Sequence, residues 1–210
     1  MFYFCEMKNC RGDDTKVEIC KEYEIKPIAF TKILNNQSKQ GCCGPLTDRY
    51  YIFSYIEKSI QSSLPEYFFV GEHCADEFLK ILGSKPLPFF NPLKQEGSSN
   101  RRNNELSLSP KHHIHPMNDE LVSAINLLCI SWNIIPKSKL ISILEFTRSR
   151  PSIPNIQGVV WLNEIIAKDS KERTLKQMIT DLSVNNNIRD FDFSELNALI
   201  DSRNLTNRIR

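Results

Sequence analysis

The distribution of cysteine constrains this chain more than any other feature of its sequence. Six of the seven cysteines lie in the first 74 residues of a chain of 210, and the seventh is Cys129. A segment of that size buries little apolar surface on folding, so small domains of this kind are commonly stabilised by a disulfide or a metal ion. In a reducing compartment, clustered thiols indicate metal ligands or redox groups more than structural disulfides.

Three short stretches hold most of these thiols. They are Cys5-x4-Cys10, Cys42-Cys43-Gly44 and His73-Cys74. Zinc takes four thiolate or imidazole ligands in a tetrahedron, and two ligands close together in sequence are easily brought to one ion. The pattern therefore predicts a zinc site in the N-terminal part of the chain.

Local patterns around the cysteines favour short strands followed by one helix. Runs rich in β-branched and aromatic residues predict strands at 1–4, 17–20, 49–56 and 66–70. A helix is expected over 74–82, and Gly83 is placed as its C-terminal cap. Cys74 would then lie in the first turn of that helix, where the positive end of the helix dipole stabilises a thiolate.

A hairpin followed by a helix whose first turn supplies a ligand resembles the treble-clef and zinc-ribbon arrangements. Phe69-Val70-Gly71-x-x-Cys74-Ala75 is similar to the last knuckle of such modules, and Cys43-Gly44 to an earlier one. The likeness covers about residues 40–82 and lacks the regular CxxC pair. It implies a small Cys-rich hairpin and helix module. The helical apolar period after residue 116 predicts an all-α domain behind it, so the expected fold class is α+β.

The predicted zinc ligands are Cys5, Cys10, Cys43 and Cys74. The alternatives left open by the sequence are Cys20, Cys42 or His73 in place of one of these four. His73 is expected to be exposed, since adjacent residues rarely bind one ion together. Ordinary buried cysteines without a ligand, and redox chemistry, are the other two interpretations.

Beyond the cysteines, the chain changes character twice. We expect a Cys-rich module at 1–92, a polar linker at 93–116 and a helical domain at 117–210. Five short helices are predicted in that last domain from their apolar spacing and candidate caps. The first covers 117–132 with Asn118 as N-cap, and the second runs from Pro136 to near Phe146. The others cover 159–166, 175–182 with Asp169 and Glu172 as a capping box, and a last segment capped by Ser194. The basic tail 203–210 is expected to be frayed.

Three of the four histidines lie in one run, His112-His113-Ile114-His115. With Asn126 and Asn133 downstream, the run superficially resembles the end of an HNH nuclease, which implies a metal-dependent nuclease with His113 activating water. The helical period around Asn126 argues against that mapping, because the family places an asparagine in an ordering loop. An exposed linker with a histidine cluster is the alternative interpretation.

Net charge and hydropathy disfavour some classes of protein but do not identify the function. The formal net charge is +2, with no basic stretch of the kind that nucleic-acid binding usually needs. No apolar run is long enough to span a membrane, the first residues do not form a signal peptide, and we expect a cytoplasmic location. Abundant Ile, Asn and Lys are typical of an AT-rich coding sequence, which suggests a bacterial mobile element.

The sequence therefore predicts a non-enzymatic, zinc-stabilised binding or regulatory protein that acts through protein–protein contacts. A homo-oligomer is possible on the same grounds. The alternatives are the HNH-like nuclease and DNA binding through the zinc module. Phosphate loops and the serine-hydrolase, zinc-protease and deaminase motifs are missing from the sequence.

Overall fold

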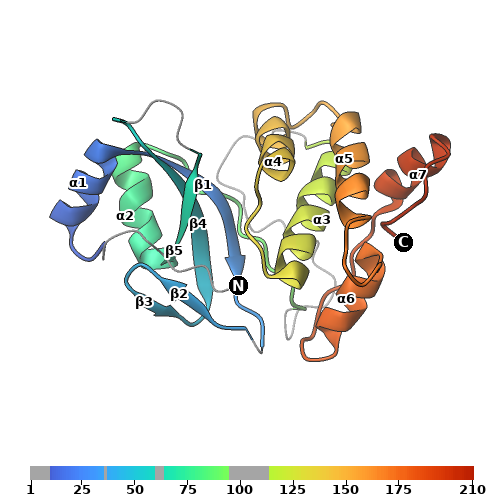
Figure 1. Cartoon of the computed structure of the whole chain (residues 1–210), viewed down its shortest axis with the longest axis horizontal. Helices are drawn as coiled ribbons and strands as arrows, with labels where there is room; N and C mark the ends of the chain where they lie inside the picture. Colours follow the sequence, from blue (N-terminus) through green and yellow to red (C-terminus); the bar gives the residue numbers. More distant parts are fainter. Residues whose placement is uncertain (1–9, 36, 60–63, 95–113) are drawn as a thin grey trace. The chain divides into compact units, whose positions relative to one another are not determined.

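A computed structural model of the chain describes residues 10–35, 37–59, 64–94 and 114–210. The chain divides into two units, Met1–Asn91 and Pro92–Arg210 (Figure 1). The elements of the first unit are α1 (Asp13–Glu22), β1 (Tyr23–Lys32), β2 (Lys39–Gly41), β3 (Gly44–Leu46), β4 (Arg49–Glu57), β5 (Glu66–Gly71) and α2 (Glu72–Leu82). Those of the second unit are α3 (Pro116–Trp132), α4 (Lys139–Ser149), α5 (Ile156–Ile166), α6 (Leu175–Ser183) and α7 (Ser194–Ser202). The described residues thus form a mixed α+β structure.

The first unit is built on an antiparallel sheet with the strand order β1-β4-β5. Figure 1 shows α1 and α2 on the same side of this sheet. The register between β1 and β4 shifts between Pro27 and Ala29. A proline lacks the N–H group that a regular β-ladder needs. A strand therefore tolerates a proline at a register shift of this kind.

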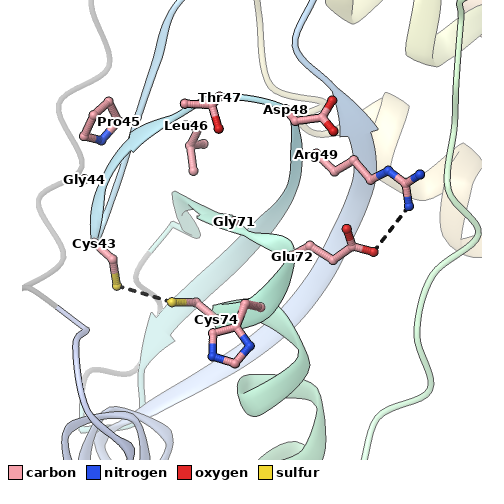
Figure 2. Close-up of a pocket in the computed structure, with 11 residues that line it drawn as sticks. Cys43, Gly44, Pro45, Leu46, Thr47, Asp48, Arg49, Gly71, Glu72 and Cys74 are labelled. Carbon is pink, nitrogen blue, oxygen red and sulfur yellow. Dashed lines mark hydrogen bonds and ion pairs between the residues drawn. The ribbon is translucent and has the colours of Figure 1, made fainter.

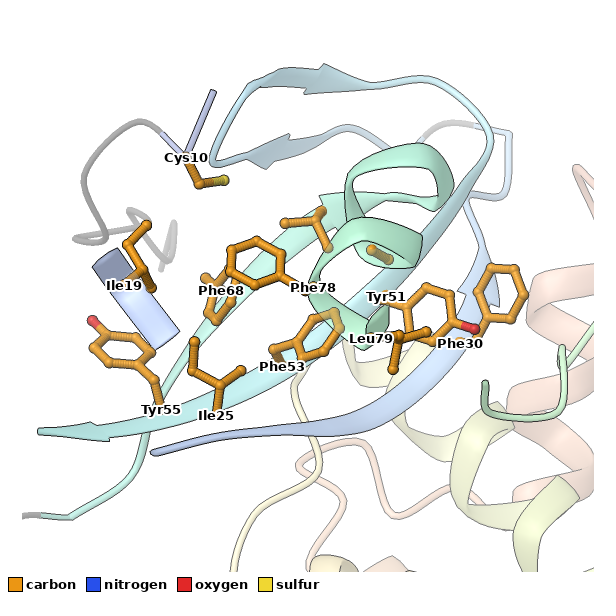
Figure 3. Close-up of a cluster of buried hydrophobic side chains, with 12 residues drawn as sticks. Cys10, Ile19, Ile25, Phe30, Tyr51, Phe53, Tyr55, Phe68, Phe78 and Leu79 are labelled. Carbon is orange, nitrogen blue, oxygen red and sulfur yellow. The ribbon is translucent and has the colours of Figure 1, made fainter. Parts of the chain in front are cut away.

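An aromatic cluster holds the sheet against its helices (Figure 3). On β4 and β5 the alternate residues point toward the helices, and Phe53 pairs with Phe68 with ring centroids 5.4 Å apart. Phe78 of α2 meets both rings at 5.8 and 5.5 Å. All three side chains are fully buried. Each such ring contributes roughly 1.5–3 kcal/mol through burial, so these residues fix where α2 lies on the sheet.

The β2–β3 hairpin turns on only two residues, Cys42 and Cys43. Its flanking positions Gly41 and Gly44 pair with each other, and Cys42 N–H donates to the Phe69 carbonyl oxygen at 2.9 Å. A Cβ added at Gly41 would lie 3.0 Å from that same oxygen, so a glycine is needed for the close approach. The hairpin is therefore attached to β5 directly before the start of α2.

The second unit packs its helices around α3. Nine residues of α3 are buried, and α3 contacts α4, α5, α6 and α7. Asn118, with no exposed surface, donates from Nδ2 to the carbonyl oxygens of Pro151 and Ile153 at 2.9 and 2.8 Å. Its Oδ1 accepts from Asn155 N–H at 3.0 Å. A buried polar side chain with these partners locks the segment before α5 onto α3.

Several expectations for the first unit agree with the structure and one is wrong. Strands over 49–56 and 66–70, and the helix ended by Gly83, are confirmed; Gly83 is left-handed with φ 60°. The expected strand at 17–20 lies instead within α1. Val17 and Ile19 favour strands locally, but the helical period places Ile19 against the aromatic cluster, and tertiary packing overrides that preference. The run 1–4 lies outside the described residues.

In the second unit, the expectation of five helices is confirmed, whereas their caps are largely wrong. The N-cap of α3 is His115, not Asn118. Pro136 precedes α4 by three residues and the helix runs on past Phe146 to Ser149. The capping box of α6 is Thr174 and Gln177, not Asp169 and Glu172. The N-cap of α7 is Phe193, since Ser194 is already helical.

The C-terminal tail is also ordered, contrary to the expected fraying. The carbonyl oxygens of Arg208 and Ile209 accept from Leu175 and Lys176 N–H at 2.8 and 3.0 Å. Asn163 bonds the tail through Thr206 and Arg208, and Ile209 is 1% exposed. The basic composition of the tail suggested an exposed segment, although Ile209 within it is buried. Within the described ranges, none of the helices has both the length and the apolar character needed to cross a bilayer.

Candidate metal centre

Three sulfur atoms, those of Cys10, Cys42 and Cys43, gather between the segment before α1 and the β2–β3 turn, and a fourth, that of Cys74 in α2, adjoins Cys43. The Sγ atom of Cys43 lies 3.3 Å from that of Cys10, 3.7 Å from that of Cys42 and 3.6 Å from that of Cys74. Zinc–sulfur bonds of about 2.3 Å in a tetrahedron place neighbouring sulfurs about 3.8 Å apart. Cys10, Cys42 and Cys43 are close enough to one another to hold a metal ion.

Each of these cysteines is placed by a different piece of local structure. Cys10 is fully buried, three residues before α1. Cys42 and Cys43 form the tight turn of the hairpin. Cys74 is the third residue of α2 and lies in its first turn. Figure 2 shows Cys43 and Cys74 facing each other across the hairpin and the helix.

Cys10 and Cys42 are joined as a disulfide in this structure, and their Cα atoms lie 5.9 Å apart. That separation is in the usual range for a cystine, so the backbone needs no rearrangement to form it. A metal ion needs thiolates, because disulfide sulfurs are poor ligands. The site can therefore exist in two chemical forms, one with four thiols and one with the Cys10–Cys42 bond.

A buried cation stands beside the sulfurs. The Lys16 side chain is 3% exposed and its ammonium forms an ion pair with Glu77. Burial acts to lower the pKa of Lys16, but the hydrogen bond to Glu77 and the negative charges of Glu77, Cys74 and Cys43 raise that pKa overall. Lysine is rarely buried unless it is paired. The lysine thus stays charged next to Cys43 and Cys74.

Desolvation works in the opposite direction on the Cys43 thiol. Burial and the hydrogen bond with Cys74 raise the pKa of Cys43 to about 11, while Lys16 and Arg11 act to lower it. Arg11 also donates from Nη2 to the Cys43 carbonyl oxygen at 2.9 Å. Without a metal ion, Cys43 is therefore a thiol at neutral pH and a weak nucleophile.

A hollow of about 360 Å³ opens next to the sulfurs. Its walls are the segment Cys43–Arg49 and the segment Gly71–Cys74 (Figure 2). Arg49 and Glu72 form an ion pair of 3.6 Å across it, with both side chains almost half exposed. The hollow combines backbone, apolar and charged surface from the same two segments that carry Cys43 and Cys74.

Of the predicted ligands, Cys10 and Cys43 lie in one group with Cys42, and Cys74 contacts that group through Cys43 at 3.6 Å. Cys5 lies outside the described residues. Of the alternatives, Cys20 packs from α1 against the aromatic cluster, and burial raises the pKa of its thiol. His73 is exposed as expected, with 92% of its side chain accessible and Nε2 3.6 Å from Glu77. Lys16 was not predicted as part of the site, because a lysine next to a predicted strand is expected at the surface.

The described residues of the nuclease alternative belong to α3 and its caps. His112 and His113 lie outside the described residues, and His115 accepts the Met117 N–H at Nδ1 as the N-cap of α3. Asn126 lies inside α3 and donates to the Val122 carbonyl oxygen at 2.8 Å, one turn back. Asn133 is the left-handed C-cap of that helix. These three residues begin, continue or end the helix itself.

The fold and the site together define an α+β protein with a cysteine cluster that could bind a metal ion. A family model matches residues 8–205, so the match spans both units. The chain therefore belongs to the family described as uncharacterised conserved protein UCP028583. Searches of curated proteins and of solved structures found no match.

Proposed function

We propose that the first unit is a zinc-stabilised binding module and that the protein acts through contacts with a protein partner. The observation that carries this proposal is the position of Cys43, whose sulfur lies 3.3 Å from that of Cys10 and 3.6 Å from that of Cys74, two residues of other segments, besides its neighbour Cys42 in the turn. A core of this size gains much from a metal ion that ties its first helix, hairpin and second helix together.

Cys10, Cys43 and Cys74 are the thiolates that we assign to the ion, and Cys5 remains the predicted fourth. Cys43 is preferred over Cys42 because it is the common neighbour of the other sulfurs. A site of three or four thiolates carries net negative charge even with the zinc dication bound, and the ammonium of Lys16 offsets part of it.

A treble-clef-like arrangement is part of the same proposal, with the hairpin and the start of α2 as its two knuckles. The hollow between Cys43–Arg49 and Gly71–Cys74 is the surface that we assign to the partner. Its shape depends on both knuckles, so the bound ion would fix it. We propose a cytoplasmic location on the ground that a reducing compartment keeps these thiols available for zinc.

Metal analysis of the protein purified under reducing conditions tests the zinc assignment. The expected result is one zinc per chain, with large losses in Cys43→Ser and Cys74→Ser. Cys20→Ser is the matched control and should keep the full content, because Cys20 is a cysteine of the same unit that lies outside the sulfur group. Wild-type protein with well under one zinc per chain would contradict the proposal.

A further inference from the structure

We propose that Cys42 is not a zinc ligand but an oxidation partner that releases the ion by forming a disulfide with Cys10. This inference rests on the proposed zinc site and assigns a regulation to it. It divides two adjacent cysteines into two roles, ligand for Cys43 and redox partner for Cys42.

The tight turn of the hairpin separates these roles. Adjacent cysteines rarely bind one ion together, and Cys43 is the one within 3.6 Å of Cys74. Cys42 instead faces Cys10, with Cα atoms 5.9 Å apart and a disulfide between them. The amide of Cys42 is held by the Phe69 carbonyl oxygen at 2.9 Å, so the position of this residue does not depend on the ion.

Accessibility decides which sulfur an oxidant meets first. Cys10 is fully buried, whereas Cys42 is partly exposed at the turn. A small hydroperoxide therefore reaches the sulfur of Cys42 before that of Cys10. A thiolate bound to zinc is also a weaker nucleophile than a free one, which favours the unligated cysteine further.

The chemistry takes two steps that balance with one hydroperoxide. The Cys42 thiolate attacks a peroxide oxygen, the O–O bond breaks, and Cys42 sulfenic acid and hydroxide form. The Cys10 thiolate then leaves zinc and attacks the Cys42 sulfur, forming the S–S bond and expelling a second hydroxide. Two electrons pass from the sulfurs to the peroxide, two protons from solvent convert both hydroxides to water, and the zinc ion loses one ligand.

Zinc release measured against disulfide mapping tests this scheme. The full-length chain is reduced, loaded with zinc and treated with hydrogen peroxide, while a chromophoric zinc indicator follows the free ion. The expected result is release of one zinc per chain, with Cys10 and Cys42 joined in the peptide map. Cys42→Ser should bind one zinc and release it at least about tenfold more slowly. Cys20→Ser should behave as the wild type.

The outcomes separate the inference from the proposed zinc site. Failure of the reduced wild type to take up zinc would overturn the zinc site and, with it, its regulated release. Normal loading followed by full retention under peroxide, or a disulfide between other cysteines, overturns only the inference. Loss of zinc binding in both Cys42→Ser and Cys42→Ala, with helix content and tyrosine signals retained, would make Cys42 a ligand and has the same consequence. Where Cys42→Ser fails to fold, the kinetics of Cys42→Ala decide.

Discussion

At the scale of single residues, Lys16 is the side chain whose role is most open to measurement. It places a buried positive charge beside Cys43 and Cys74 and is not among the ligands proposed for zinc. Outer contacts of this kind typically change metal affinity by about 10- to 100-fold. We expect Lys16→Met to weaken zinc binding by about tenfold in a competition titration with a chromophoric chelator. Lys21→Met changes an exposed lysine of the same helix and should leave the affinity unchanged.

Asp169 is the corresponding buried charge in the second unit. It accepts hydrogen bonds from Arg173, from Trp132 at 2.7 Å and from two backbone amides, and these hold its pKa well below the usual range. A depressed pKa stabilises the fold above the unfolded value of about 3.9, and that stabilisation is lost as the pH falls toward the folded value. The wild type should therefore lose stability steadily from about pH 5 downward.

Replacing this carboxylate tests the argument. Asp169→Asn should cost about 3 kcal/mol in the free energy of unfolding at pH 7, since it leaves buried donors and the Arg173 guanidinium poorly paired. The slope of stability against pH below 5 should become shallower in this variant. Asp181→Asn removes a 57% exposed partner of the same arginine and should cost less than about 1 kcal/mol. Urea unfolding followed by tryptophan emission measures both, and equal losses in the two variants would refute the assignment.

At the scale of elements, the C-terminal tail provides a sharp test because sequence reasoning and structure disagree about it. Ile209 is almost fully buried, whereas Leu205 in the same tail is 41% exposed. Ile209→Ala should destabilise the second unit by about 2–4 kcal/mol, the range for truncating a buried isoleucine. Leu205→Ala should stay within about 1 kcal/mol. A stability unchanged by Ile209→Ala would mean that the tail is only loosely held.

Elements with a long apolar period or an aromatic run were predictable, and those decided by distant contacts were not. The pattern around Tyr50–Tyr55 marks β4, and the apolar period marks α3. β1 was missed because Pro27 and its charged residues weaken the pattern, although pairing with β4 supplies its hydrogen bonds. Asn118 looked like a cap since asparagine commonly is one, but its partners lie more than 30 residues away.

The cysteine cluster shows the same division. Cys43 and Cys74 were recognisable from a neighbouring glycine and a following helix. The meeting of Cys42 with Cys10 depends on how the hairpin lies against the segment before α1. The sequence of this two-residue turn does not indicate whether Cys42 or Cys43 faces Cys10, or which of them faces Cys74.

At the scale of the whole molecule, the aromatic residues divide between the two units. All six tyrosines lie in Met1–Asn91, and both tryptophans lie in Pro92–Arg210. Near-ultraviolet tyrosine signals therefore report the first unit, and tryptophan emission reports the second. Zinc bound at the proposed site would stabilise the first unit by about 4 kcal/mol when free zinc is about 1,000 times its dissociation constant.

Removing zinc with a chelator should thus lower the midpoint of the tyrosine transition and leave the tryptophan transition in place. Thermal unfolding followed at both wavelengths measures this in one sample. The metal-free protein with zinc restored is the control, and it should recover the original tyrosine midpoint. A tryptophan transition that shifts by the same amount would show that the two units unfold as one.

Gly41 has a consequence for how this family can diverge. Any side chain there would press on the Phe69 carbonyl oxygen and on Leu46, and Gly44 has φ 133°, which other residues rarely adopt. The two glycines and the two cysteines between them are therefore expected to be conserved together or lost together. A lineage that keeps the cysteine pair is expected to keep both glycines, whereas one that has lost the cysteines has no reason to retain so short a turn. Ancestral-sequence reconstruction across the family should therefore show the glycines and the cysteine pair gained or lost together.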